Sequence, residues 1–175
     1  KERFIKDMKL DEYDAGLLCK DIDLASFFEA VVNQCGEPKM AANWLITELL
    51  AKINREEISV GYSPISPSML GELITKIKDD TLSSKTAKTL FESLWNKPGD
   101  PIERIKSLGL EQIDDSNTLE AIVNTVIKKN SDQVEQLQNG KTKVLGYLVG
   151  QIMKETSGKA NPKKVNELIR TILEL

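Results

Sequence analysis

The stretch that decides the fold is VGQIMKETSGKANP, residues 149–162, which joins the end of one predicted helix to the start of the next. Gly158 can take the positive φ that ends a helix, and Asn161 followed by Pro162 supplies an N-cap and a first-turn proline. The stretch therefore predicts a helix-turn-helix corner. The apolar residues that recur at helical spacing before it are Val144, Leu145, Leu148, Val149 and Ile152.

Lysines gather around this corner and around one other helix start. In the first turn of a helix the macrodipole favours carboxylates, so a lysine there is unfavourable by a few tenths of a kcal/mol or more, about the size of the dipole effect itself. Free backbone N–H groups and ammonium groups together make a phosphate site, which would offset that penalty. The alternative is that these lysines are ordinary solvated surface. The candidate phosphate-binding residues are Lys141, Lys143, Lys154, Lys159, Lys163 and Lys164.

Helical periodicity continues on both sides of the corner, and no run of alternating β-branched residues indicates a strand. The sequence therefore predicts an all-α fold of two small helical domains, an N-terminal helical bundle over 1–110 and a four-helix tail over 111–175. Residues 109–115 lack a helical stripe and are the best linker candidate. Predicted helix starts lie near Asp21, Pro38, Pro67 and Ser83 or Ser84, with a helix end at Gly36.

The net charge differs between the N-terminal and C-terminal parts of the chain. Residues 1–115 hold 15 Lys and Arg against 21 Asp and Glu, a net charge of −6, whereas residues 116–175 hold 9 against 6, a net charge of +3. The C-terminal part has one arginine, Arg170, and one aromatic residue, Tyr147. Base-specific contacts use bidentate groups and single strands stack on aromatic rings, so the lysines suit phosphate contacts to a folded RNA better.

Composition weighs against several other classes. The 175 residues are 40% hydrophobic, which suits globular domains, and no apolar run approaches the roughly 20 residues that span a bilayer. No signal peptide opens the chain, so we expect a cytoplasmic or organelle-matrix protein without a membrane segment, and of the two we favour the cytoplasm. There is no histidine, so Cys19 and Cys35 have no partner for a zinc site and are expected to be reduced core residues.

Signals for an enzyme are weak. The segment Gly140-Lys141-Thr142 ends like a phosphate loop, but Glu135 stands where that motif needs its first glycine and the preceding segment is helical. Trp44 and Trp95 lie on helical stripes and are expected in the core. Three acidic pairs lie at predicted helix starts or turns, where acids serve as caps: Glu56-Glu57, Asp79-Asp80 and Asp114-Asp115.

Several separate motifs occur in the order of a known family. In the C-terminal part these are Val149-Gly150-Gln151, Met153-Lys154, Gly158, Ala160-Asn161-Pro162 and Val165-Asn166. In the earlier part they are Leu10, Tyr13-Asp14-Ala15, Phe28-Glu29, Pro38-Lys39, Ala42-Asn43-Trp44, Glu48-Leu49, Ser84-Lys85 and Ala87-Lys88. On these residues the chain resembles the C-terminal region of the B subunit of aspartyl/glutamyl-tRNA(Asn/Gln) amidotransferase.

The resemblance implies a helical domain followed by a GatB/YqeY-type tail that grips the outer corner of a tRNA. It implies a part in a ligase that converts Glu-tRNA(Gln) or Asp-tRNA(Asn) to Gln-tRNA(Gln) or Asn-tRNA(Asn), with A and C subunits as partners. ATP and Mg²⁺ belong, by the resemblance, to an N-terminal catalytic domain that this chain lacks. We therefore expect a C-terminal fragment without catalytic, cofactor or metal residues of its own.

Two other functions stay open at this point. One is a protein-interaction scaffold, in which the helical domain docks on the catalytic domain or a partner subunit without touching tRNA. An exposed apolar patch on residues 1–110 would favour it. The other, an autonomous enzyme, is the weakest reading because no nucleophile and base pair stands out.

Overall fold

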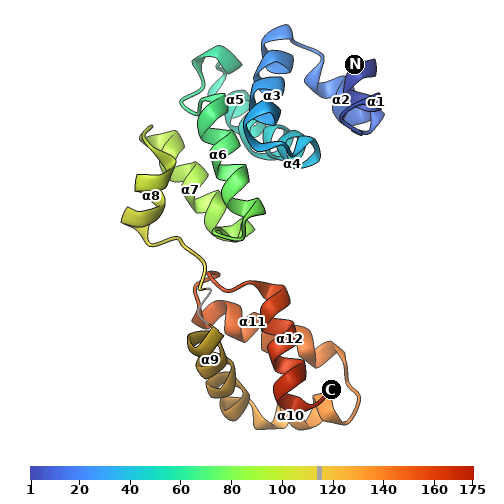
Figure 1. Cartoon of the computed structure of the whole chain (residues 1–175), viewed down its shortest axis with the longest axis vertical. Helices are drawn as coiled ribbons and strands as arrows, with labels where there is room; N and C mark the ends of the chain where they lie inside the picture. The colour runs from blue at the N-terminus through green and yellow to red at the C-terminus, as the bar shows by residue number, and fades with distance from the viewer. Residues whose placement is uncertain (114–115) are drawn as a thin grey trace. The chain divides into compact units, whose positions relative to one another are not determined.

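The computed structural model describes residues 1–113 and 116–175, and every regular element in those residues is helical (Figure 1). The all-α prediction is confirmed. Contacts divide the chain into two compact units, the first made of Lys1–Asp79 with Thr89–Leu108 and the second of Asp80–Lys88 with Gly109–Leu175. The domain boundary near residue 110 stays a prediction. The second unit includes residues 80–88, which that prediction gives to the first domain, and residues 114–115 of the expected linker lie outside the described ranges.

Capping residues explain where the helices of the first unit begin. The Asp11 carboxylate accepts a hydrogen bond from the Asp14 backbone N–H at 2.8 Å, and Asp21 and Ser66 cap their helices in the same way. Gly36 has a φ of 69° and ends its helix as predicted. The elements are α1 (Glu2–Lys6), α2 (Glu12–Leu18), α3 (Ile22–Cys35), α4 (Pro38–Trp44), η1 (Leu45–Leu49), α5 (Leu50–Glu56), η2 (Val60–Tyr62), α6 (Pro67–Lys78), α7 (Ser84–Asn96) and α8 (Pro101–Leu108).

The helix predicted from Pro38 to about Asn54 contains a wider turn. Between α4 and α5 the segment η1 is a π-helix, and the whole helical stretch runs on to Glu56. The extra residue per turn shifts the apolar stripe around the axis. Trp44 and Leu45, the neighbouring residues at the junction of α4 and η1, are both buried.

An aromatic cluster anchors the core of the first unit. The Phe91 ring centroid lies 6.0 Å from that of Trp44 and 5.9 Å from that of Trp95, within the range of favourable ring contacts. Both tryptophans are buried, which confirms their predicted place in the core. Cys35 is also buried, and burial raises the pKa of its thiol. Neither Cys35 nor the half-buried Cys19 is in a disulfide.

The second unit is built around four helices. They are α9 (Ser116–Lys129), α10 (Ser131–Gln138), α11 (Lys143–Glu155) and α12 (Pro162–Leu173), and α11 packs against the other three (Figure 1). Within the described part of the chain, none of the helices is both long and apolar enough to cross a membrane. The buried core residues are Leu119, Val123, Val126, Val134, Leu137, Leu145, Leu148, Ile152, Ala160, Val165 and Ile169.

Candidate nucleic-acid interface

The predicted corner lies between α11 and α12. Gly158 has a φ of 81°, and its backbone N–H donates to the Met153 carbonyl at 2.7 Å, closing the end of α11. Asn161 then caps α12, because its side-chain oxygen accepts from the Lys163 backbone N–H at 2.9 Å, and Pro162 is the first helical residue. The helix-turn-helix corner is confirmed.

The six candidate lysines fall into two groups. Lys154, Lys159, Lys163 and Lys164 lie along the corner, whereas Lys141 and Lys143 lie at the opposite end of α11. All are exposed except Lys159, which is half-buried. Because α11 has 13 residues, its two ends are about 18 Å apart. That separation is too long for a single phosphate group and fits an extended polyanion.

One face of α11 connects the two groups, and we call it the α11 strip. At 3.6 residues per turn its members span an arc of about 100°. The buried leucines and isoleucine of α11 lie on the opposite side, so the strip faces away from the core of the second unit. The α11 strip consists of Lys143, Gly146, Tyr147, Gly150 and Lys154.

Two glycines lie in the middle of the α11 strip, and no contact within the second unit requires a glycine at either position. A Cβ added at Gly146 or Gly150 would meet no heavy atom within 4 Å, and neither residue has a positive φ. A glycine in a helix interior is less stable than alanine by roughly 0.5–1 kcal/mol. Tyr147 beside them is 47% exposed and donates from its hydroxyl to the Asn130 side-chain oxygen at 3.4 Å. The strip therefore lets the backbone of a partner approach the helix closely, with an ammonium group at each end.

Sequence reasoning identified the lysines but missed these two glycines. The signal was present, since two glycines one turn apart interrupt an otherwise regular helical pattern. Sequence alone could not show that both face outward onto open space.

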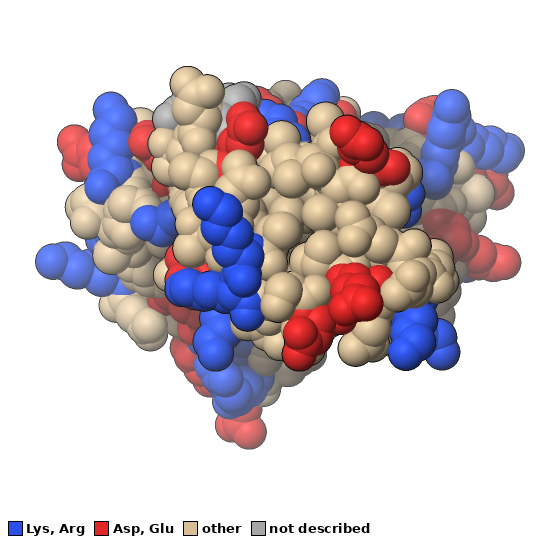
Figure 2. Space-filling view, turned by 90° about the horizontal axis from the view of Figure 1, so that it is seen from below, with Lys and Arg blue, Asp and Glu red and all other residues tan. Residues whose placement is uncertain are grey.

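The surface of the second unit is not uniformly basic. Figure 2 shows the end that is drawn lowest in Figure 1, where a broad uncharged area is bordered by both basic and acidic side chains. A polyanion would thus be held by local groups of lysines and not by a general positive field.

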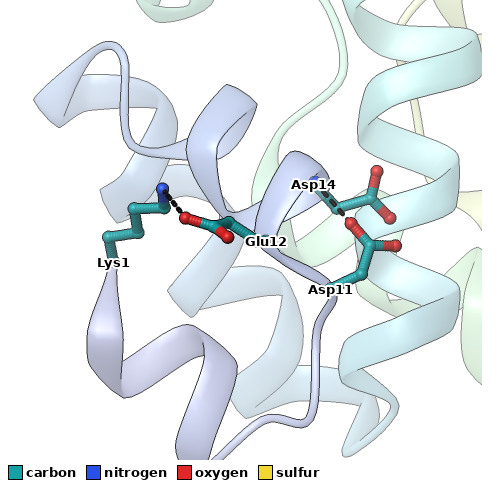
Figure 3. Close-up of polar contacts among 4 residues, drawn as sticks. All are labelled: Lys1, Asp11, Glu12 and Asp14. Atoms are coloured by element: carbon teal, nitrogen blue, oxygen red, sulfur yellow. Dashed lines mark hydrogen bonds and ion pairs between the residues drawn. The ribbon is translucent and has the colours of Figure 1, made fainter.

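The acids of the first unit act mainly as caps and surface ion pairs. Lys9, Leu10, Asp11, Asp14 and Lys39 line a hollow of about 350 Å³ at the start of α2. In it the Asp11 carboxylate caps α2, and burial together with the charge of Asp11 raises the pKa of Asp14 (Figure 3). Beside this hollow, Figure 3 shows Lys1 reaching the Glu12 carboxylate at 2.9 Å. Among the described residues, no group of three or more His, Cys, Asp or Glu side chains is placed to hold a metal ion.

Comparison with known proteins gives the family. A family model described as the GatB domain matches residues 26–173. The B subunits named aspartyl/glutamyl-tRNA(Asn/Gln) amidotransferase from Alkalilimnicola ehrlichii and Alcanivorax borkumensis are 42% and 46% identical over 98% and 99% of this chain. A relative of the same name from Thiobacillus denitrificans is 46% identical over 98% of the chain. The chain spans 36–37% of the length of these relatives. On this match the chain belongs to the GatB domain family.

Proposed function

We propose that the second unit binds tRNA through its sugar-phosphate backbone, as the C-terminal part of an amidotransferase B subunit. The observation that carries the proposal is the α11 strip, where two outward glycines lie between Lys143 and Lys154 with open space above them. A phosphodiester chain can lie against the helix backbone there, and each lysine neutralises a phosphate.

Lysine contacts to phosphate groups limit which features of a nucleic acid the second unit can recognise. Lysine ammonium groups position a nucleic acid without reading its bases, and base readout relies on bidentate groups such as arginine. Residues 116–175 contain one arginine, Arg170. The second unit therefore selects the shape of a folded tRNA, and the choice between Gln and Asn acceptors lies with other parts of the subunit.

The names of the relatives suggest the wider role of the second unit. In this proposal the unit orients Glu-tRNA(Gln) or Asp-tRNA(Asn) for amidation by a cytoplasmic complex with A and C subunits. ATP and Mg²⁺ act in the catalytic domain of the B subunit, which we assign to residues outside this chain. Residues of this chain hold the substrate and take no chemical step.

A salt series tests the proposal directly. We would measure the affinity of the 175-residue chain for tRNA(Gln), for tRNA(Asn) and for a tRNA that is not a substrate. The Lys143→Gln/Lys154→Gln variant removes both charged ends of the α11 strip. The slope of log affinity against log salt concentration is negative, and each lost phosphate contact reduces its magnitude by about 0.7–0.9. The magnitude should therefore be about 1.4–1.8 smaller for the double variant than for the unchanged chain.

A control variant must separate the effect of a lower positive charge from the effect of where the two lysines lie. The control variant Lys20→Gln/Lys106→Gln removes two exposed lysines from the first unit and changes the net charge equally. It should keep the slope of the unchanged protein. Equal slopes for both double variants, or no measurable binding by the unchanged chain, would contradict tRNA binding by the α11 strip.

A second candidate function uses the first unit. Tyr13 of α2 is 74% exposed and Ile22, the first residue of α3, is 81% exposed, and a contiguous apolar patch at these residues would favour docking to another protein. We propose that this unit docks on the catalytic domain or a partner subunit. Replacing both residues by serine should weaken assembly with A and C subunits in gel filtration and leave tRNA binding unchanged. Assembly that is unaffected would remove this function.

A further inference from the structure

Residues 80–88 are fastened to the α11–α12 corner, although more than 60 residues separate the two in sequence. The Gln112 backbone N–H donates to the Thr81 carbonyl at 2.8 Å, and the Ile113 N–H donates to the Lys159 carbonyl at 3.0 Å. The Asn161 side-chain amide donates to the Asp80 carboxylate at 3.3 Å. These contacts all lie within the second unit.

Ser83 holds the first turn of α7 against the α11–α12 corner within the second unit. Its hydroxyl is buried, donates to the Gly158 carbonyl at 2.7 Å and accepts from the Thr86 backbone N–H at 3.1 Å. The same oxygen therefore caps α7 and bonds to the turn that carries Lys159. The first turn of α7 is thereby held at a defined place beside that turn.

The side chain of Lys85, in that first turn, crosses over Gly158. Its Cδ lies 2.6 Å from the place that a Cβ on Gly158 would occupy, and its Cε lies 3.4 Å from it. Gly158 thus provides a positive φ and also leaves room for the lysine stem. A stem that is already packed loses less rotamer freedom when its ammonium group binds a ligand.

We propose that Lys85 is a further phosphate-contacting residue of the same tRNA-binding surface, acting beside Lys159. The inference rests on the proposed function of the second unit and adds a residue from a distant segment to it. Lys85 is an exposed residue. Together with the corner lysines it forms a basic group built from two separate parts of the chain. The Asp80 carboxylate also lies at this group, because it accepts the hydrogen bond from Asn161.

The test replaces the charge and keeps the stem. Lys85→Met retains an unbranched apolar side chain over Gly158, so the fold should be kept while the ammonium group is lost. With tRNA, the magnitude of its log-log salt slope should fall by about 0.7–0.9, which is a loss of about five- to eightfold in affinity at 0.1 M salt relative to 1 M. Lys85→Arg should bind as the unchanged chain does, and the matched control Lys20→Met should keep both affinity and slope. Thermal unfolding of each variant checks that it is folded.

The outcomes separate the two proposals. If Lys85→Met binds as tightly and with the same slope as the unchanged chain while Lys143→Gln/Lys154→Gln loses affinity, the role of Lys85 is overturned and tRNA binding by the α11 strip stands. If Lys85→Met unfolds, Lys85→Arg and Lys85→Gln decide the matter, since only a charge-dependent contact is restored by arginine and lost with glutamine. If the unchanged chain does not bind tRNA, both proposals fail together.

Discussion

The glycines of α6 and α11 have the same local conformation and opposite surroundings. A Cβ on Gly71 of α6 would lie 2.5 Å from the Cβ of Gln34 and 3.3 Å from the Val31 carbonyl, because α3 packs directly against that position. A Cβ on Gly146 or Gly150 of α11 would touch nothing within 4 Å. The first glycine is explained by the fold, whereas for the other two we propose a partner that lies against the α11 strip.

The largest effect is expected at Gly71. Gly71→Ala brings two side chains that are fixed close to their backbones into overlap, so α3 and α6 must move apart. Overpacking of this kind destabilises by about 1–3 kcal/mol, and we expect the upper end of that range. Urea unfolding followed by circular dichroism measures it. An unfolding free energy equal to that of the unchanged chain would mean that Gly71 does not set the helix distance.

The next effect is at Gly158, with Gly140 as its match. Both have a positive φ, 81° and 87°, so alanine at either position is strained by about 1–2 kcal/mol. Only at Gly158 must the Lys85 stem also shift, whereas at Gly140 nothing lies within 4 Å. Gly158→Ala should therefore destabilise more than Gly140→Ala and should also weaken tRNA binding. Equal losses of stability for the two variants would contradict the packing of Lys85 on Gly158.

Gly146→Ala and Gly150→Ala should act in the opposite direction on stability. Each should stabilise the second unit by about 0.5–1 kcal/mol, since alanine is the better helix former and no clash arises. Their tRNA affinity should nevertheless fall, because the added methyl groups keep the phosphate backbone away from the helix. Unfolding and binding are measured on the same samples. Higher stability with unchanged affinity would show that the α11 strip is an ordinary exposed surface.

The smallest effect is at Gly16 in α2. Its nearest neighbour for a new Cβ is the flexible end of Lys1 at 3.9 Å, so Gly16→Ala should stabilise the chain by about 0.5 kcal/mol or slightly more. It should leave tRNA binding unchanged. A thermal shift assay and one binding curve suffice, and a loss of affinity here would mean that α11 is not special among the exposed helices.

Local chemistry explains what the sequence could predict. Asp21, Gly36, Pro67 and Asn161 mark helix ends through their own side chains or backbone, so their roles are readable from a few neighbouring residues. Periodicity likewise placed both tryptophans in the core. The family resemblance rested on short motifs, and the match over residues 26–173 confirmed it.

Contacts over long distances explain what the sequence could not predict. Gly71 and Gly146 have the same place in an apolar pattern, and only the packing partner distinguishes them. Nothing near Lys85 in sequence indicates that it crosses Gly158. The sequence placed the lysines of the tail around two helix starts, but it could not give the distance of about 18 Å that the length of α11 puts between the two groups.

The bond between Ser83 and Gly158 also has a consequence for synthesis. The two residues are 75 positions apart, so the hydroxyl of Ser83 has no access to that carbonyl until 75 more residues have been made. At about 5–20 residues per second, the wait on the ribosome is roughly 4–15 s. During that time the start of α7 has its own cap, from the Ser83 hydroxyl to the Thr86 N–H, but lacks the turn on which it packs. The second unit therefore closes only after Gly158 has been made.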